Sequence, residues 1–377
     1  MRLVRLALTA GVLVGLLLTV PSRASAQQGD EKEFKAEFLR LCDLACRELN
    51  REPRRPPRHK AFYADSYAVR ALAAAYDMTR REEYLQACKT WSDRMVDYQQ
   101  KMIPKGAYYM NYGRKPGETK GDWYVADSSS IAMGVLATAV RCRNPKDRER
   151  YLDSVKAFAK LVMDNYVGPG GGITDGLWRQ YDGEWWCSSG IFASLGFLLY
   201  EETGDEAYRK VALETLDWLN KLEVSQVKHI SFEAAAPAVL MYVLEAYSAG
   251  ATHLEPGTER RRAAVAQIAK ALKWMAGNQQ GRGAENRWDY NSQWGSKLGG
   301  LPFHMIVYAR HLDEFRGIDA EADRELRHVR SVLAKDQPPA LSQLAVFALM
   351  SYAEKAAPGA IYRSSRTGLG ERGTSGP

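Results

Sequence analysis

Residues 121–131 have the sequence Gly121-Asp-Trp-Tyr-Val-Ala-Asp-Ser-Ser-Ser-Ile131, in which two aromatic side chains come just before a carboxylate, Asp127. The residues after Asp127 are apolar at helical spacing, so this carboxylate is predicted to stand in the first turn of a buried helix. The tetrapeptide Val-Ala-Asp-Ser at 125–128 has a counterpart, Tyr-Ala-Asp-Ser, at 63–66, which opens another apolar helix. A motif that opens two helices of the same kind indicates an internal repeat.

After about Glu31 the chain has helical character throughout, because Ala, Leu, Glu, Lys and Arg fill stretches of helical period. We expect helices near residues 31–50, 64–78, 81–100, 127–142, 146–166, 188–202, 205–221, 232–248, 258–279, 298–314, 319–334 and 340–355. Helices that are apolar nearly all round, and therefore buried, alternate with amphipathic, charged ones. Six such pairs predict an all-α fold, an (α/α)6 barrel with the apolar helices inside and the charged helices outside.

The predicted connections differ in length. Those from a buried helix to the next amphipathic helix are short, whereas those in the other direction are long and aromatic, at 101–126, 167–187 and 280–297. Long loops in a compact domain are usually functional or disordered. These would gather at the N-terminal ends of the inner helices, where free N–H groups and the helix dipoles favour an anionic ligand. We therefore expect the site at this end.

The N-terminal residues have the pattern of a secretory signal peptide. Arg2 and Arg5 precede an apolar run, 6–20, and Ala24-Ser25-Ala26 is typical of a cleavage site. The run is too short and wrongly flanked to span a membrane. We expect a signal peptide over 1–26, a toroid domain over 27–357 and a disordered polar tail over 358–377. The protein is then exported, periplasmic or extracellular, with no membrane association after signal cleavage.

Charge and cysteine content exclude several classes of function. Loss of Arg2, Arg5 and Arg23 with the signal peptide lowers the formal charge from +7 to about +4, which is too modest for a nucleic-acid partner. The chain has five cysteines, so at least one thiol stays free. Cys42 and Cys46 are predicted to pack as small hydrophobes. No spacing of Cys and His suggests zinc, and we expect no metal and no cofactor.

Asp65 and Asp127 are the predicted catalytic residues. Apolar neighbours follow each of them at helical spacing, so both carboxylates are expected on the inner face of the ring. Two acids that face one cavity can transfer protons to and from a glycosidic oxygen or a water molecule. The alternative is that both serve only as helix N-caps, a position that Asp prefers.

Aromatic residues and a few polar ones at the same end are the predicted substrate-binding residues. Aromatic faces stack on sugar rings, and an arginine fork holds a carboxylate. One or two of the indoles would instead plug the barrel if they are packing residues. The predicted set is Trp123, Tyr124, Tyr63, Trp178, Arg179, Trp185, Trp186, Glu233, Arg287, Trp288 and His304.

These features resemble the six-hairpin glycosidase superfamily and, within it, the unsaturated glucuronyl and rhamnogalacturonyl hydrolases of glycoside hydrolase families 88 and 105. The resemblance rests on the helix count, the two inner-helix aspartates and the segment Trp-Tyr-Val-Ala-Asp at 123–127. It implies that Asp127 is the general acid and base that hydrates the double bond of an unsaturated uronyl residue, with Asp65 as its partner. The expected substrate is an oligosaccharide or polysaccharide, and an anionic one.

Two other functions remain open at the level of sequence. A polysaccharide lyase shares the predicted architecture and would use Tyr63, Tyr124 or His304 as the base beside a neutralised uronate. A non-catalytic carbohydrate-binding toroid would carry aromatics in its mouth without a carboxylate near the sugar. If Asp127 and Asp65 turned away from the ring interior and only capped their helices, the hydrolase interpretation would be wrong.

Overall fold

The computed structural model describes residues 23–50, 62–109, 123–174, 183–224, 237–280, 309–315 and 343–357. Within these ranges the only extended pairings are isolated bridges, Val167 with Ile173 and Thr174 with Glu184. The described helices are α1 (Arg23–Asn50), α2 (Phe62–Thr79), α3 (Glu82–Gln99), α4 (Val125–Ala139), α5 (Pro145–Asn165), α6 (Trp186–Thr203), α7 (Glu206–Asn220), α8 (Pro237–His253), α9 (Glu259–Gln280), η4 (Asp313–Phe315) and α12 (Gln343–Ala356).

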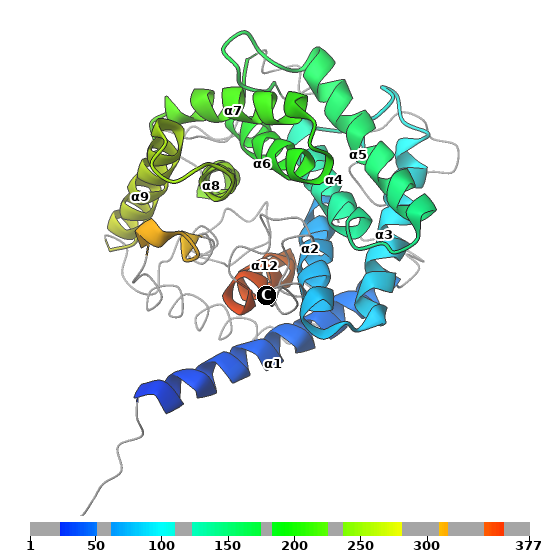
Figure 1. Ribbon diagram of the computed structural model, residues 1–377, viewed down its shortest axis with the longest axis vertical. Helices are drawn as coiled ribbons and strands as arrows, with labels where there is room; N and C mark the ends of the chain where they lie inside the picture. The colour runs from blue at the N-terminus through cyan, green and yellow to red at the C-terminus, as the bar shows by residue number, and fades with distance from the viewer. Residues whose placement is uncertain are drawn as a thin grey trace, which may run out of the picture.

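The helices form two concentric layers. The inner layer contains α12, α2, α4, α6 and α8, each packed on the next in that order. Helices α3, α5, α7 and α9 lie outside them, and Figure 1 shows the resulting ring. The fold is an all-α (α/α)6 toroid, as the sequence predicts.

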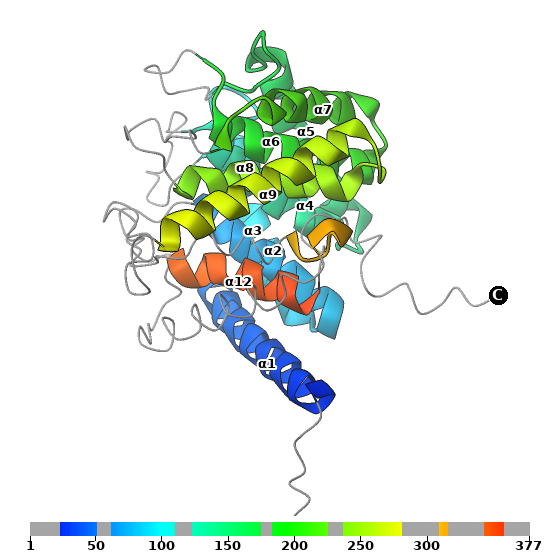
Figure 2. The same ribbon diagram turned by 90° about the vertical axis from the view of Figure 1, so that its left-hand side faces the viewer.

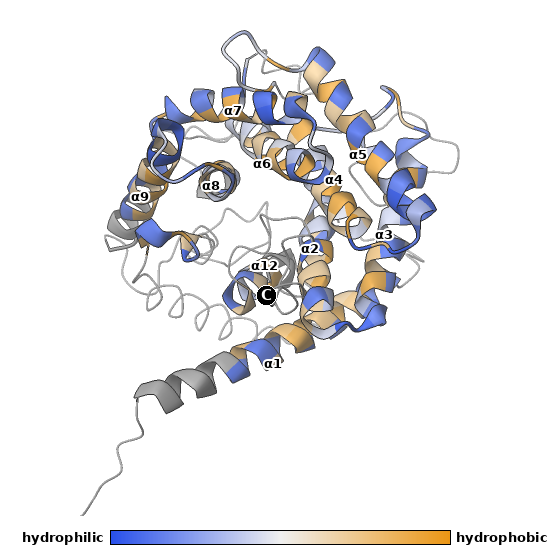
Figure 3. Cartoon of the chain, viewed as in Figure 1, coloured by the Kyte–Doolittle hydropathy of each residue, from blue (hydrophilic) through white to orange (hydrophobic). Residues whose placement is uncertain are grey.

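The division into layers follows from the distribution of apolar residues. Every residue of α4 except Asp127 and Ala137 is buried, as a helix surrounded by other helices requires. The outer helix α5 instead buries a stripe that includes Tyr151, Val155, Phe158 and Val162 and leaves a charged face outside. Figure 3 shows this difference between the two layers.

The short connections are built as the sequence predicts. Asn144 caps α5 by accepting a hydrogen bond from the backbone N–H of Lys146, and Asp205 caps α7 in the same way. Gly204 ends α6 with φ 71°, a left-handed conformation that glycine adopts without strain. These turns all lie at the C-terminal ends of inner helices, so the longer connections lead to the N-terminal ends.

One predicted boundary is wrong. Helix α1 begins at Arg23 instead of near residue 31, so it includes the expected cleavage site. Its additional residues are mostly good or neutral helix formers, which a cleavage-site pattern does not prevent from folding as a helix. The predicted start of helix α8, near 232, lies outside the described residues, which show this helix from Pro237 to His253. Figure 2 shows α1 extending beyond the ring.

The remaining predicted elements have different outcomes. All five cysteines are buried free thiols, so Cys42 and Cys46 pack as predicted. Most of the predicted helices near 298–314 and 319–334 lie outside the described residues, as do residues 1–22 and 358–377. None of the helices in the described ranges combines the length and hydropathy that a membrane-spanning segment requires.

Candidate functional site at the N-terminal ends of the inner helices

Asp127 lies in the first turn of α4 but is not its N-cap. The N-cap is Tyr124, with an extended backbone (φ −137°, ψ 149°). Asp127 is partly exposed in a helix that is otherwise almost entirely buried. It also lies near enough to Tyr242 of α8 to act on it electrostatically. Because α6 stands between α4 and α8, the Asp127 side chain must point into the interior of the ring.

Tyr242 of α8 has Asp127 and two tyrosines of α2, Tyr63 and Tyr67, near enough to act on it electrostatically. Burial raises the pKa of Tyr242 well above its ordinary value, and the neighbouring Tyr63, Tyr67 and Asp127 raise it further. A phenol with a raised pKa stays protonated at neutral pH and donates a hydrogen bond. The inner helices thus bring together a carboxylate and hydroxyl donors, and such groups can form hydrogen bonds with a sugar.

Asp65 lies in the first turn of α2, at the same end of the ring as Asp127. Its side chain is buried, and the residue is 1% exposed. The adjacent Ser66 hydroxyl donates a hydrogen bond of 2.5 Å to the carbonyl oxygen of Tyr63, within the same turn. The two predicted catalytic carboxylates therefore differ in access: a ligand in the mouth meets Asp127 before Asp65.

The predicted aromatic residues of this end divide by exposure. Trp123 is buried and lies edge-on to Tyr166, with ring centroids 5.3 Å apart. Trp185 is buried as the N-cap residue of α6. Tyr124 and Trp186 are partly exposed and border the ends of their helices. Packing thus accounts for Trp123 and Trp185, and a contact between any of these aromatics and a sugar stays a prediction.

The other predicted site residues lie outside the described residues. They are Trp178, Arg179, Glu233, Arg287, Trp288 and His304. Their roles stay predictions. In the part of the chain that the structure describes, no group of acidic, His and Cys side chains is arranged to hold a metal ion.

The sequence analysis missed an ion pair inside the ring. Arg70 of α2 and Glu245 of α8 lie with Nη1 and Oε1 2.6 Å apart, and their side chains are 4% and 1% exposed. The Arg70 guanidinium also lies 5.6 Å from the ring centroid of Tyr67. The signal was present in the sequence, since each is a charged residue in the middle of an apolar helix. Such residues are rarely buried unless they are paired.

The opposite end of the inner helices is closed by ion pairs. Arg141, in the turn that follows α4, binds Asp77 of α2 through Nε and Nη2, with the shortest separation 2.5 Å. Glu202 at the end of α6 binds Arg148 of α5. At this end the acidic side chains are therefore already engaged by cations of neighbouring helices.

A hydroxyl, an imidazole and a carboxylate also meet at the closed end. His311 lies 2.8 Å from the Thr252 hydroxyl through Nε2 and 3.1 Å from Glu354 through Nδ1. The Thr252 hydroxyl, however, donates its hydrogen to the carbonyl oxygen of Ser248, at 2.7 Å. An imidazole that accepts no proton from the hydroxyl does not activate it as a nucleophile. This cluster links helix ends and is not a catalytic triad.

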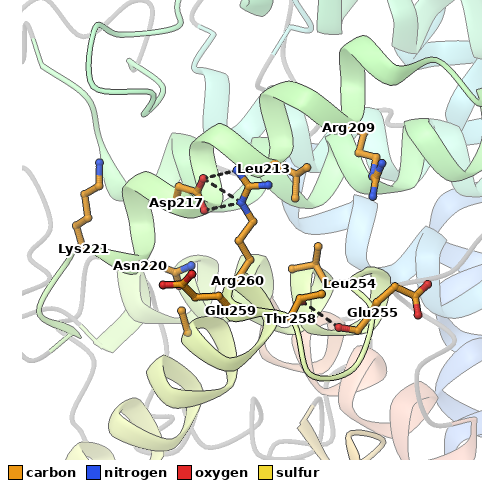
Figure 4. Close-up of a pocket in the computed structure, with 11 residues that line it drawn as sticks. Arg209, Leu213, Asp217, Asn220, Lys221, Leu254, Glu255, Thr258, Glu259 and Arg260 are labelled. Atoms are coloured by element: carbon orange, nitrogen blue, oxygen red, sulfur yellow. Dashed lines mark hydrogen bonds and ion pairs between the residues drawn. The ribbon is translucent and has the colours of Figure 1, made fainter.

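A groove lies on the outside of the ring, between α7 and α9, with a volume of about 770 Å³. Figure 4 shows that Arg260 spans it and binds Asp217, at 2.8–3.1 Å. Its lining residues are charged, polar and aliphatic, and include no aromatic side chain. A sugar would find no stacking surface there, so the mouth at Asp127 is the better candidate.

The ring fold with its site at one end defines a structural class, the (α/α)6 toroids. The family model of glycosyl hydrolase family 76 matches residues 51–235, a segment that contains both Asp65 and Asp127. The chain is also similar in structure to a protein described as glycoside hydrolase family 76 (mannosidase) Bt3792 from Bacteroides thetaiotaomicron VPI-5482. The TM-score is 0.59 and the identity 13%, over 85% of this chain and 98% of the other.

A second similar structure is polysaccharide lyase BACCELL_00875, with a TM-score of 0.54 and 14% identity over 85% of this chain and 97% of the other. No curated protein matches the sequence significantly. At these identities the likenesses show the toroid fold alone. The matched glycoside hydrolase family is 76, whereas the sequence features resemble families 88 and 105.

Proposed function

We propose that the protein is a glycoside hydrolase of the family 76 type that cleaves a mannoside linkage in an oligosaccharide or polysaccharide, with Asp127 at its catalytic centre. The observation that carries the proposal is the position of Asp127, partly exposed on a buried helix and directed into the ring beside Tyr242. The family match over residues 51–235 and the mannosidase with the same fold support the substrate class.

Glycoside hydrolysis requires one group that protonates the leaving oxygen and a second that activates water or attacks the sugar. In our proposal Asp127 contacts the glycosidic oxygen or the water, because it is the accessible carboxylate of the pair. Asp65, buried in the first turn of the neighbouring helix α2, is its proposed partner. Tyr242, which stays protonated, donates a hydrogen bond to the bound sugar or to Asp127.

An unsaturated uronyl sugar, the substrate that the sequence resemblance implies, is the second candidate. The first turns of α2, α4, α6 and α8 lie at one end of the ring, and their dipoles favour an anion there. A different observation favours a neutral sugar. Arg70 is the only Lys or Arg in these four helices, and its charge is already bound to Glu245.

A lyase reaction is less well supported. It requires a base that removes the proton beside the uronate carboxylate, and a tyrosine serves as that base more readily when its pKa is lowered. The pKa of Tyr242 is shifted in the opposite direction, by burial first and then by Tyr63, Tyr67 and Asp127, so this tyrosine is not suited to the role. The bases that the sequence offers for a lyase, Tyr63, Tyr124 and His304, stay predictions. Export from the cytoplasm, which residues 1–26 predict, is a further part of the proposal.

A substrate panel separates these functions. The purified protein would be incubated with mannans and manno-oligosaccharides of both anomeric configurations, and with saturated and unsaturated uronic oligosaccharides. Release of reducing ends from a mannoside that Asp127→Asn abolishes is the expected result. Loss of absorbance of the conjugated double bond would favour uronyl hydration instead, and a gain would favour a lyase. No reaction with any substrate, together with binding, would favour a carbohydrate-binding toroid.

A further inference from the structure

The ion pair between Arg70 and Glu245 joins two inner helices that are not neighbours. Along the described part of the ring, α4 and α6 stand between α2 and α8. Figure 1 shows α2 and α8 on facing sides of the opening. A contact of 2.6 Å between side chains of these helices therefore crosses the interior of the ring.

Stability alone does not explain this pair. Transfer of two charges from water to a buried position costs several kcal/mol for each ion, and apolar residues of similar volume are often as stabilising or more so. Both side chains are almost completely buried, at 4% and 1% exposure. Since α2 and α8 are otherwise apolar in this part, a pair of aliphatic residues would have been the simpler solution.

The pair lies one helical turn below the residues of the site. Arg70 follows Tyr67 by three positions on α2, and Glu245 follows Tyr242 by three positions on α8. Residues three apart on a helix lie on the same face. The guanidinium of Arg70 contacts the ring of Tyr67 directly, with 5.6 Å to the centroid. Tyr67 and Asp127 both lie near enough to Tyr242 to act on it electrostatically.

We propose that the Arg70–Glu245 ion pair is a positioning device: it fixes the separation of α2 and α8 across the ring and thereby holds Tyr67 and Tyr242 in place around Asp127. The pair does not touch the reacting atoms. Its effect on catalysis comes from the geometry of the groups above it, and this inference rests on the proposed function. Misplacement of catalytic groups by about 1 Å can cost about 100-fold in rate. We therefore expect the loss to fall on kcat, with KM nearly unchanged.

The chain contains a matched control. Asp77 and Arg141 form a buried pair, 2.5 Å apart with side chains 11% and 6% exposed, that joins α2 to the turn after α4 at the closed end. It shares helix α2 with the positioning pair but lies two helical turns further from Tyr67. The apolar double variants Arg70→Met with Glu245→Met, and Asp77→Leu with Arg141→Met, remove one pair each without leaving a lone buried charge.

The experiment measures kcat and KM on the mannoside that the wild type cleaves, together with Tm. We expect the Arg70/Glu245 double variant to fold and to lose about 10- to 100-fold in kcat, while the Asp77/Arg141 double variant keeps a kcat within about twofold of wild type. A kcat retained by the first variant, or lost equally by the second, would overturn the proposal. If the first variant does not fold, Arg70→Lys decides: a lower kcat supports positioning and an unchanged kcat contradicts it.

A second readout does not depend on catalysis. The protein would be labelled with 3-fluorotyrosine, and the ¹⁹F resonances of Tyr67 and Tyr242 assigned with Tyr→Phe variants. These resonances should shift in the Arg70/Glu245 variant and stay in place in the Asp77/Arg141 variant. Unshifted resonances would contradict the positioning role. Shifted resonances in a protein that cleaves no mannoside would instead show that the proposed function is wrong and the positioning role is right.

Discussion

The two ends of the inner helices use the same residue types for different purposes. At the N-terminal end, Asp127 stands partly exposed among tyrosines, in a helix that is otherwise buried. At the C-terminal end, Asp77 is held by three hydrogen bonds from Arg141, and Glu202 is held by Arg148. An ion pair between two helices strengthens the fold, whereas a carboxylate that is partly exposed at the end of the ring is accessible to a ligand. The difference between the ends locates the site.

The largest effect is expected at the mouth. Asp127→Asn removes the proton-transfer group and should lower kcat by about 10²- to 10⁴-fold. The asparagine side chain has the same size, and the loss of a negative charge in the first turn of α4 should cost about 0.3–1 kcal/mol of stability. Initial rates on a cleaved mannoside and urea unfolding measure the two quantities. Retained turnover would remove Asp127 from its proposed role.

The opposite pattern is expected at the closed end. Arg141→Met leaves Asp77 as a buried carboxylate without its principal partner, since the nearest other cation, Arg80, is 4.0 Å away. The free energy of unfolding should fall by about 3–5 kcal/mol. The rate per folded molecule should stay at the wild-type level when it is measured well below Tm. A lower rate in the folded protein would show that the two ends are coupled.

Two glycines of α6 give a comparison within one helix. A Cβ at Gly190 would lie 2.5 Å from the carbonyl oxygen of Tyr242, and a Cβ at Gly196 would lie 2.9 Å from the Cβ of Ala212 and 3.0 Å from the carbonyl oxygen of Tyr208. Both Ala variants should lose about 1–3 kcal/mol of stability through overpacking. Only Gly190→Ala displaces Tyr242, so only it should also lower kcat. Equal rates for the two variants at equal folded concentration would weaken the assignment of Tyr242 to the site.

Two tyrosines of α8 allow a finer test. Tyr247 donates a hydrogen bond of 2.7 Å to the carbonyl oxygen of Leu219, and its removal in Tyr247→Phe should cost about 1 kcal/mol of stability without affecting the rate. Tyr242→Phe should show the reverse, with about a tenfold lower kcat, which corresponds to about 1.4 kcal/mol. Thermal unfolding and steady-state kinetics on both variants measure the contrast. An effect of Tyr247→Phe on the rate would argue against a site that involves Tyr242 and not Tyr247.

The smallest expected effect concerns alkaline stability. Burial, with the nearby Tyr63, Tyr67 and Asp127, raises the pKa of Tyr242 above the value of about 10 that tyrosine has in an unfolded chain. Its contribution to stability is therefore complete below about pH 10 and is lost as the pH rises towards the folded-state pKa. Tyr242→Phe should show a shallower loss of stability above about pH 10 than wild type. Identical alkaline unfolding profiles would contradict the pKa shift.

The sequence predicted the fold because the relevant signals are local. Apolar periodicity identified the inner helix α4, and the short connections that the sequence predicts contain the caps Asn144 and Asp205 in the structure. The end of the ring that carries Asp127 followed from loop lengths. The ion pair of Arg70 with Glu245 could not be predicted from the sequence. It joins residues that are far apart in the chain and meet only because the ring closes.

The candidate site was predicted in part for the same reason. Asp127 was identified from the motif that opens its helix, whereas Tyr242 has no local motif and becomes part of the site only through ring geometry. The sequence could not show which tryptophans are buried, because a tryptophan that packs and one that binds a sugar have the same local pattern. In the structure Trp123 and Trp185 are buried.

The most direct test of the account is a crystal structure of the Asp127→Asn variant with a manno-oligosaccharide that the wild type cleaves. We predict that the sugar lies at the N-terminal ends of the inner helices, with a glycosidic oxygen within hydrogen-bonding distance of the residue 127 side chain and the Tyr242 hydroxyl facing the same sugar. An oligosaccharide bound in the outer groove between α7 and α9, or at the mouth but away from residue 127, would contradict it.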